Sequence, residues 1–415
     1  MDKSIVLKIL RDAFRIDRVR YPESRVLTVA HDNDRSLLHN GRWYSPLVDT
    51  MEDDLRLRDL RCASIARIIS RIKGDVAYGN VMSPEGAFAR ALLVKRLSSR
   101  FSGGVYPYSA MEEKIWGHIL DETGARKVFG IQPSREMCVA CHKRGVWVAD
   151  VQHGVIGESH PWYGIRFRGE DPKEWLPDAF VVWDAGSAAV IDRWAAAKGI
   201  ETIVTGNRWV ARFLKRAPHD RLVEELFATY GDRLAAPTGM KSILITLSWG
   251  NENIPNGFLP DALCDIIRST QGRYDWKVRL HPNQLSGFAT HEGQRFNQFF
   301  EKHLKGLVEW EAATRAPLPV VLAQTDLHLS WASSVAIEAA QCGIRSGLME
   351  PALRDPNKFG DYYTYYRNRG MIDFLEPTQD GIIDWISANL DSRQAPEAFG
   401  AYDQAYARLL DFLAN

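Results

Sequence analysis

Residues 325–349, TDLHLSWASSVAIEAAQCGIRSGLM, constrain the fold more than any other part of the chain. Residues 327–331 are predicted to form a short buried strand, residues 335–342 a compact helix, and residues 345–349 the start of another strand. Gly343 stands where the helix should end, because glycine adopts the left-handed conformation of that position without steric cost. A strand, a helix and a strand joined by such short turns predict a βαβ unit and therefore a parallel sheet.

Two serines, Ser333 and Ser334, directly precede this predicted helix, where an N-cap belongs. Free backbone N–H groups, serine hydroxyls and the positive end of the helix dipole meet at such a turn, which suits a phosphate group. Glu338 follows Ser334 by one helical turn, so its carboxylate could accept hydrogen bonds from ribose hydroxyls. An ordinary capped helix would contain the same serine pair, so the interpretation depends on neighbouring segments.

A second predicted strand end also has polar residues. The segment WKVRL, residues 276–280, is typical of a buried parallel strand, and it places Arg279, His281 and Pro282 at its carboxyl end. Open α/β sheets bind ligands at this edge. The loop after the predicted strand 241–247 should open at the same edge. The residues expected to bind the nucleotide or its phosphate are therefore Arg279, His281, Pro282, Ser333, Ser334, Glu338, Ser248 and Gly250.

The order of an HP pair and a later SS pair resembles the nucleotide-binding half of bacterial surface-polysaccharide transferases of the GT-B architecture. The resemblance is to polysialyltransferases and Kdo transferases, which use CMP-sugars, and to teichoic-acid glycerophosphotransferases, which use CDP-glycerol. It covers the C-terminal part of the chain and one motif of the N-terminal part. In those families the HP histidine and the serines hold the donor phosphate, so the resemblance implies this role for His281, Ser333 and Ser334.

The N-terminal motif follows the predicted strand 146–151 and consists of Gln152, His153 and Gly154. A histidine at this position can present its imidazole at the sheet edge, because the following glycine lets the backbone turn away. A loop histidine hydrogen-bonded to the backbone is the structural alternative.

The His-Gly pair is similar to the motif that supplies a catalytic histidine in the glycerophosphotransferases, whereas polysialyltransferases have an acidic pair before the glycine. Gln152 and His153 stand here in place of that acidic pair. This difference favours His153 as the general base, with Glu158 or Asp150 as the alternative base. The loop after the motif contains aromatic residues that could stack on a sugar. The residues expected to contact the acceptor are Gln152, Gly154 and His160.

The chain has 415 residues, which is too long for one ordinary core and predicts about two domains. Proline, glycine and small residues at 234–239 separate two series of alternating strands and helices. We therefore expect an α/β protein of two Rossmann-like domains, residues 1–236 and 237–415, that face each other across a cleft in a GT-B-like arrangement. The first should bind the acceptor and the second the nucleotide donor.

The composition excludes some classes of partner. Lys+Arg and Asp+Glu both number 52, so the strongly basic surface of a typical nucleic-acid-binding protein is not expected. Apolar runs fall short of the roughly 20 residues of a membrane span, and early charges argue against a signal peptide. We expect a cytoplasmic protein, with peripheral association at the inner membrane or with other glycan-assembly enzymes as a further expectation.

The segment Cys138-Val-Ala-Cys141-His142 matches the c-type haem attachment pattern. Such attachment requires export, and the segment is better explained as a packing helix with two buried cysteines. A zinc site would need two more ligands, and a second CxxC is missing from the sequence. The acids at 52–54 are interpreted as charges in the first turn of a helix. We therefore expect no metal and no cofactor.

Together these features predict a metal-independent glycosyltransferase that moves a sugar from a nucleotide donor, preferably CMP-linked, to a glycan acceptor. The acceptor would be an oligosaccharide or lipid-linked glycan of capsule or lipopolysaccharide, and His153 would be the base. Three alternatives remain open. They are a CDP-glycerol-type glycerophosphotransferase, a nucleotide-sugar epimerase, which needs no acceptor, and a non-enzymatic carbohydrate-binding protein, which would tolerate loss of His153.

Overall fold

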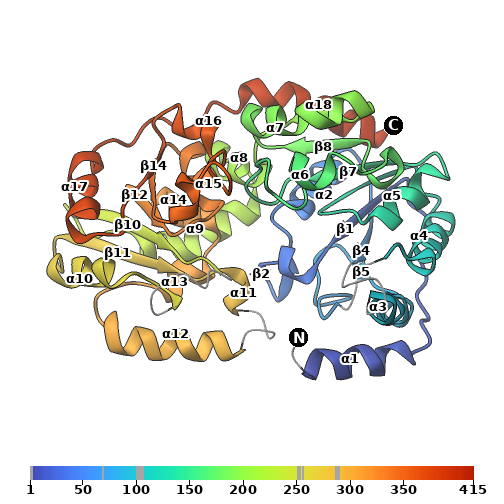
Figure 1. The fold of residues 1–415 in the computed structure, drawn as a ribbon, viewed down its shortest axis with the longest axis horizontal. Coiled ribbons are helices and arrows are strands. Elements are labelled where there is room, and N and C mark those ends of the chain that lie inside the picture. Colours follow the sequence, from blue (N-terminus) through green and yellow to red (C-terminus); the bar gives the residue numbers. More distant parts are fainter. Residues whose placement is uncertain (1–2, 68–69, 100–106, 250–253, 255–256, 286–289) are drawn as a thin grey trace. The chain divides into compact units, whose positions relative to one another are not determined.

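The computed structural model describes residues 3–67, 70–99, 107–249, 254, 257–285 and 290–415. These residues form two compact units (Figure 1). Unit 1 consists of residues 1–153, 161–206 and 400–415, and unit 2 of residues 154–160 and 207–399. Each unit contains a parallel sheet, so the predicted α/β class is confirmed.

The sheet of unit 1 has seven strands, and each neighbouring pair is parallel. In spatial order they are β5 (Val81–Met82), β4 (Ala63–Ala66), β1 (Val26–Ala30), β6 (Lys127–Gly130), β7 (Trp147–Val151), β8 (Ala179–Val182) and β9 (Glu201–Val204). Counted along the chain, the order is 3-2-1-4-5-6-7. This is the doubly wound Rossmann order, and it reverses between β1 and β6.

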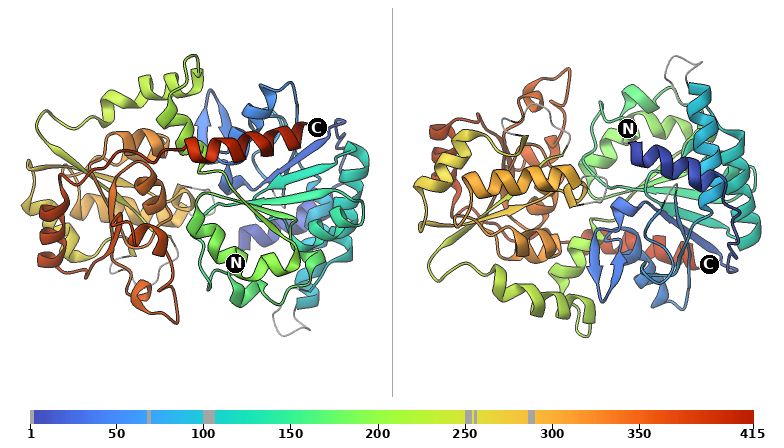
Figure 2. Two further views of the ribbon diagram at one scale, coloured as in Figure 1. Left: turned by 90° about the horizontal axis from the view of Figure 1, so that it is seen from above. Right: turned by 90° about the horizontal axis from the view of Figure 1, so that it is seen from below.

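Helices cover both faces of this sheet. The helices of unit 1 are α1 (Lys3–Ala13), α2 (Val48–Arg56), α3 (Glu85–Ser99), α4 (Ala110–Thr123), α5 (Arg135–His142), α6 (Ile165–Arg168), α7 (Ala185–Ala195) and α18 (Gly400–Ala414). Figure 2 shows helices on each side of the strands. Leu27 and Val29 of β1 belong to the core beneath α4 and α5, whereas Val26 and Ala30 belong to the core beneath α2 and α18. Alternate side chains of a strand point to opposite faces, which explains this division. A hairpin of β2 (Leu37–His39) and β3 (Arg42–Tyr44) completes the unit.

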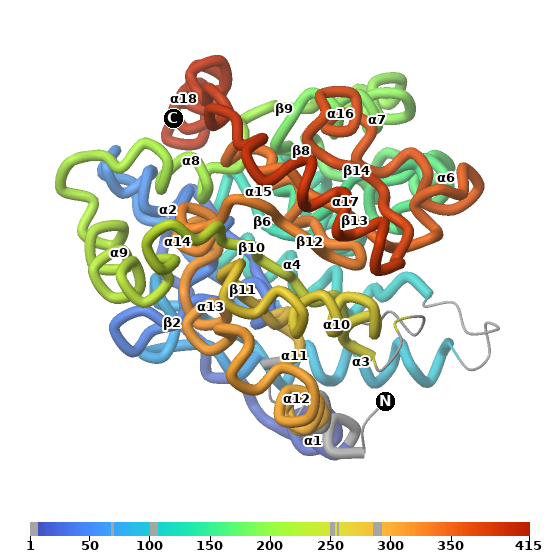
Figure 3. The backbone as a smooth tube through the Cα atoms, turned by 90° about the vertical axis from the view of Figure 1, so that its left-hand side faces the viewer, coloured from blue at the N-terminus to red at the C-terminus, as the bar shows by residue number. Residues whose placement is uncertain are grey.

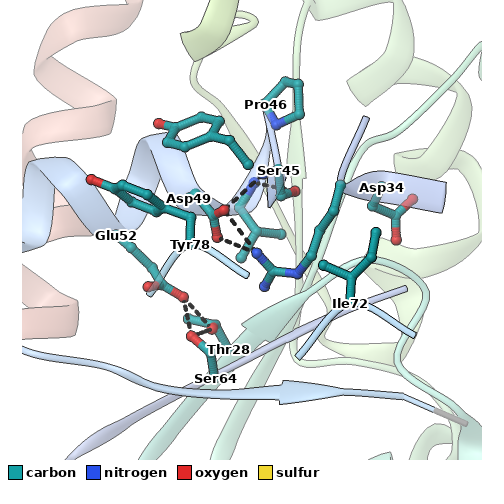
Figure 4. A network of polar contacts seen from close by, with 12 residues as sticks. Thr28, Asp34, Ser45, Pro46, Asp49, Glu52, Ser64, Ile72 and Tyr78 are labelled. Atoms are coloured by element: carbon teal, nitrogen blue, oxygen red, sulfur yellow. Dashed lines mark hydrogen bonds and ion pairs between the residues drawn. The ribbon is translucent and has the colours of Figure 1, made fainter. Parts of the chain in front are cut away.

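Helix α2 is joined to the sheet by buried polar contacts (Figure 4). Glu52 accepts hydrogen bonds from Thr28 of β1 and Ser64 of β4, and Asp49 forms a buried ion pair with Arg35 at 2.8 Å. The acids at 52–54 therefore lie in the second half of the helix, and the prediction of first-turn charges was wrong. The helix begins earlier than expected because Ser45 and Asp49 bond within the preceding turn.

The sheet of unit 2 has five parallel strands. In spatial order they are β11 (Tyr274–Arg279), β10 (Lys241–Thr246), β12 (Leu327–Ser330), β13 (Arg345–Leu348) and β14 (Ile372–Phe374). The order along the chain is 2-1-3-4-5, a second doubly wound arrangement that reverses between β10 and β12. Beyond β11, the segment near 307–311 adds one parallel bridge, between Lys277 and Glu309.

The helices of unit 2 are α8 (Arg208–Lys215), α9 (Arg221–Leu234), α10 (Asp261–Ser269), α11 (Pro282–Leu285), α12 (Thr290–His303), α13 (Glu311–Arg315), α14 (Leu318–Ala323), α15 (Val335–Gln341), α16 (Thr364–Arg367) and α17 (Gln379–Asn389). Helices α10, α12 and α17 cover the apolar face of the sheet, where Ile243, Ile245 and Val278 lie in one core. Strand β10, helix α10 and strand β11 follow one another along the chain, which is the alternation of strands and helices predicted from the sequence.

The two units do not divide at the predicted boundary of 236/237. Helices α8 and α9 pack against α14, so residues 207–236 belong to unit 2. Helix α18 returns to unit 1, where Leu409 and Leu413 are buried in the core beneath the sheet. Proline and glycine at 234–239 mark a loop correctly, but composition does not indicate which sheet the preceding amphipathic helix covers.

Cys138 and Cys141 lie on the predicted packing helix, α5, and are buried in the core of unit 1. All five cysteines are free thiols. Within the described ranges, no group of three or more potential metal-ligating side chains was found. None of the described helices combines the length and apolar composition that crossing a bilayer requires.

Candidate functional site

Strands β10 and β12 lie side by side (Figure 3). Because they are parallel, their carboxyl ends meet where the strand order of unit 2 reverses. Ser248 follows β10, and its hydroxyl donates to the Ala332 carbonyl at 2.6 Å while it accepts from the Ala332 amide at 3.2 Å. This buried hydroxyl joins the two loop tips. Ser248 therefore supports the site, and its proton is already used within the loop.

The serine turn begins α15. Ser333 Oγ accepts from the Val335 amide at 3.2 Å, and the Ser333 carbonyl accepts from the Tyr363 hydroxyl at 3.0 Å. Ser333 is thus the residue that caps the helix. Ser334 makes no capping bond with its side chain, and among the described residues its hydroxyl has no partner. Ser333 therefore stabilises the turn, and the Ser334 hydroxyl is available to a ligand.

His281 is fixed by a capping arrangement at the start of α11. Its backbone N–H donates to Gln284 Oε1 at 2.8 Å, and the Asn283 N–H donates to His281 Nδ1 at 3.1 Å. Pro282 occupies the first helical position, where its missing N–H costs nothing. The sequence H-P-N-Q contains the signal for this cap, a Gln three residues after the cap residue, but Gln284 was not predicted as a site residue.

The imidazole of His281 is neutral at pH 7. Burial, and the charge of Arg279, lower the pKa of His281 to about 4. Because Nδ1 accepts a hydrogen bond, the hydrogen-bond network assigns the ring proton to Nε2. The ring stacks on Trp249 with 6.4 Å between the ring centroids. The end of β11 therefore presents one fixed N–H donor.

Arg279 and Glu338 form the charged part of this site. Arg279 Nη1 donates to the carbonyls of Ala313, Thr314 and Ala316, so this nitrogen stabilises the turn at 313–316. Burial lowers the pKa of Arg279 to about 10. Burial raises the pKa of Glu338 to about 7, against the opposing effects of Arg279 and of Asn207, whose amide donates to Glu338 at 3.3 Å. Gly250 lies outside the described residues.

Unit 1 has a polar cluster at its own point of strand reversal. His153 Nε2 lies 2.8 Å from Gln132 Nε2, and His153 Nδ1 lies 2.6 Å from the Tyr163 hydroxyl. Gln132 follows β6 in a left-handed conformation, with φ of 52°, and its N–H donates to Asp150 at 3.0 Å. Both ring nitrogens of His153 are therefore engaged by side chains from other segments.

Charges surround this cluster. Arg67 follows β4 and donates to the Gln132 carbonyl, and its own N–H donates to the Ala30 carbonyl at 3.2 Å. Burial raises the pKa of Asp150 to about 7, and burial with the nearby Arg67 and His153 lowers the pKa of His31 to about 3. Arg67, Gln132 and Tyr163 were not predicted as site residues. Gln132 and Tyr163 follow the predicted strand 127–131 and the His153 motif, whereas no strand was predicted before Arg67, which follows β4.

Gln152 and Gly154 do not have the predicted surroundings. Gln152 is buried, and its amide accepts from the Trp183 N–H at 2.8 Å and donates to Ser187 at 3.2 Å. These contacts join β7 to the segment after β8, and they direct the Gln152 amide to Trp183 and Ser187. Gly154 has no left-handed backbone, and an added Cβ would meet nothing within 4 Å, so the turn does not require glycine there.

The loop 154–160 is grouped with unit 2. The Glu158 N–H donates to Asp361 at 2.6 Å, and an added Cβ at Gly157 would meet the Tyr362 ring at 2.2 Å. Asp361, which directly precedes Tyr362, thus anchors the backbone of Glu158. His160, which was predicted to contact the acceptor, lies in the same loop. Burial lowers its pKa to about 4.

Comparison with known proteins gives a fold. No protein-family model and no curated protein matches the chain. UDP-GlcNAc 2-epimerase from Neisseria meningitidis, bound to UDP-GlcNAc, matches with a TM-score of 0.56 and 11% identity, over 94% of this chain and 100% of that one. The wall teichoic acid polymerase TagF matches with a TM-score of 0.55 and 12% identity, over 99% and 90% of the two chains.

The chain has the GT-B fold. Two Rossmann-like domains are what the sequence predicts, so the predicted fold class is confirmed. The structures quoted above are enzymes, but neither is a polysialyltransferase or a Kdo transferase. At 11% and 12% identity, these matches show a shared fold.

Proposed function

We propose that the protein is a glycosyltransferase of the GT-B type that transfers a sugar from a nucleotide donor, preferably CMP-linked, to a surface-glycan acceptor without a metal ion. The observation that supports this most strongly is the capped, neutral His281 beside the β10/β12 reversal. Ligands of open α/β sheets bind at such a reversal. A fixed neutral N–H donor there suits a phosphate oxygen.

The donor phosphate would be held in unit 2. His281 Nε2–H and the Ser334 hydroxyl would supply hydrogen-bond donors, and Glu338 would accept from ribose hydroxyls. Negative charge develops on the departing phosphate during transfer, so donors that are already oriented lower the barrier. The proposal needs no metal because these groups and the charge of Arg279 can balance that charge.

His153 would act as the general base. In the tautomer with its proton on Nδ1, the ring donates to the Tyr163 oxygen and presents the Nε2 lone pair where the Gln132 amide now lies. An acceptor hydroxyl that displaces this amide would give its proton to Nε2. Its oxygen then bonds to the anomeric carbon, and the bond from that carbon to the phosphate oxygen breaks with its electron pair on the phosphate.

A second candidate function is transfer of a glycerophosphate group from CDP-glycerol. It is favoured by the His153-Gly154 pair and by the fold shared with TagF. The same histidines would act, with attack at phosphorus in place of carbon. An epimerase, which the other structural match suggests, would release its nucleotide without an added acceptor.

A thermal-shift panel of CMP, CDP, UDP, GDP and ADP tests the nucleotide assignment. A nucleotide at about 100 times its dissociation constant should stabilise the protein by about 2.7 kcal/mol. We expect the cytidine nucleotides to give the largest shift, and Ser333→Ala/Ser334→Ala to lose about 2–4 kcal/mol of binding free energy. Ser269→Ala on α10 is the control, because its hydroxyl bonds only the helix carbonyl of Ile266. Unchanged affinity in the folded double variant would remove the assignment.

A further inference from the structure

The segment from α1 to Arg20 exposes large apolar side chains. Leu7 is 67% exposed, Phe14 86% and Ile16 82%, and Leu10 is 39% exposed. Single exposed apolar residues are common on soluble proteins, but four of them within one short segment are not. Helix α3 packs against α1 (Figure 1). It exposes two more large apolar side chains, Val94 and Leu97.

The exposed charges of this segment are positive. Arg11, Arg18 and Arg20 are exposed, and Arg15 is largely exposed although it pairs with Glu85 at 2.8 Å. The acids of the segment turn inward. Asp12 is buried, and Asp17 accepts from the Gly86 and Ala87 amides at 2.9 and 2.7 Å.

The structure holds this segment in place. Asp17 binds the first amides of α3, and Arg90 of α3 donates to the carbonyls of Ala13 and Arg15, each at 3.0 Å. Gly86 permits the approach, because a Cβ there would lie 2.2 Å from the Arg15 carbonyl oxygen. The apolar side chains and arginines are therefore presented outward by specific contacts between α1, its following loop and α3.

We propose that residues 7–20 form a docking surface for an anionic membrane. Leu7, Leu10, Phe14 and Ile16 would enter the boundary between headgroups and acyl chains, and the arginines would contact lipid phosphates. The choice of an anionic lipid surface rests on charge complementarity, since both acids of the segment face the protein. This docking is independent of the transfer reaction and does not rest on it.

Co-sedimentation of the full chain with lipid vesicles tests the proposal. Vesicles of phosphatidylglycerol and phosphatidylcholine, mixed about one to one, should bind the protein at low salt, and vesicles of phosphatidylcholine alone should bind it far less. Phe14→Ser/Ile16→Ser should weaken partitioning by about 100-fold, from the lost burial of two large apolar side chains. Arg18→Gln/Arg20→Gln should weaken it by about 10- to 30-fold, and added salt should reduce that effect.

Two controls match these changes. Leu57→Ser removes an apolar residue that is 84% exposed at the end of α2, and Arg233→Gln/Lys302→Gln removes two exposed charges of unit 2. Both should leave partitioning within about twofold of the unmodified protein. Equal binding to neutral and anionic vesicles, no binding to either, or an equal loss in the controls would overturn the proposal. So would a dimer that dissociates in Phe14→Ser/Ile16→Ser without any lipid binding, because this surface would then join two copies of the chain.

Discussion

Burial keeps several histidines of this protein neutral. His328 lies on β12 in the middle of the unit 2 sheet, with Nε2 2.8 Å from Thr246 of β10 and Nδ1 2.9 Å from Ser346 of β13. Burial lowers its pKa to about 3. The two hydroxyls satisfy the ring nitrogens, which is the condition for placing a polar side chain between strands.

This placement predicts a pH dependence of stability. Below about pH 6.5 the unfolded chain takes up a proton on His328, whereas the folded protein does not until about pH 3. The free energy of unfolding should therefore fall by about 1.4 kcal/mol per pH unit from this residue as the pH drops through that window. Urea unfolding of His328→Gln should show a shallower pH dependence than the unmodified protein. The exposed His118→Gln serves as control, and identical slopes in all three proteins would contradict the account.

At the scale of elements, the strand ends explain the site better than the loops do. The loop 157–163 was predicted from its residue types to contact an acceptor, yet the path of its first part is determined by Gly157 and by the bond from the Glu158 N–H to Asp361. Gly154, which the sequence suggests as the turning point, has room for a side chain.

The two glycines therefore give a matched pair of variants. Gly157→Ala should displace the Tyr362 ring, because its Cβ would lie 2.2 Å from that ring, and destabilise the protein by about 1–3 kcal/mol. Gly154→Ala should change the stability by less than about 0.5 kcal/mol. Chemical denaturation measures both. Tyr362→Ala should relieve the Gly157→Ala defect, and equal stability of the two glycine variants would show that the loop does not pack as described.

At the scale of the whole molecule, the division into units depends on the last helix. Leu409 and Leu413 of α18 are buried in the core of unit 1, although they are more than 200 residues from the nearest strand of that sheet. Leu409→Ala/Leu413→Ala should lower stability by about 2–5 kcal/mol per leucine. Hydrogen exchange should quicken in β1 and β6 but not in β10. The exposed Gln404→Ala is the control, and faster exchange in β10 alone would place α18 with the other unit.

The sequence predicts the repeated strands and helices, the GT-B class and the strand ends that bear polar residues. These follow from local patterns: apolar runs, capping residues and histidines just after strands. It does not predict the partners of those residues. Gln132 and His153 are 21 residues apart, and Asn207 and Glu338 are 131 residues apart, so only the folded chain brings them together. The same limit explains the misplaced boundary at 236/237.

His153 and His281 are proposed to have different functions, the first as general base and the second in binding the donor phosphate. Measuring turnover and nucleotide affinity in the same variants tests this difference most directly. His153→Ala should lower kcat by about 10²–10⁴ and leave nucleotide affinity nearly unchanged, because the donor is held by unit 2. His281→Ala should weaken nucleotide affinity and kcat together, since a group that holds the phosphate acts in the ground state and the transition state. His118→Ala should match the unmodified enzyme. Near-normal turnover in His153→Ala, or undiminished nucleotide affinity in His281→Ala, would contradict the account.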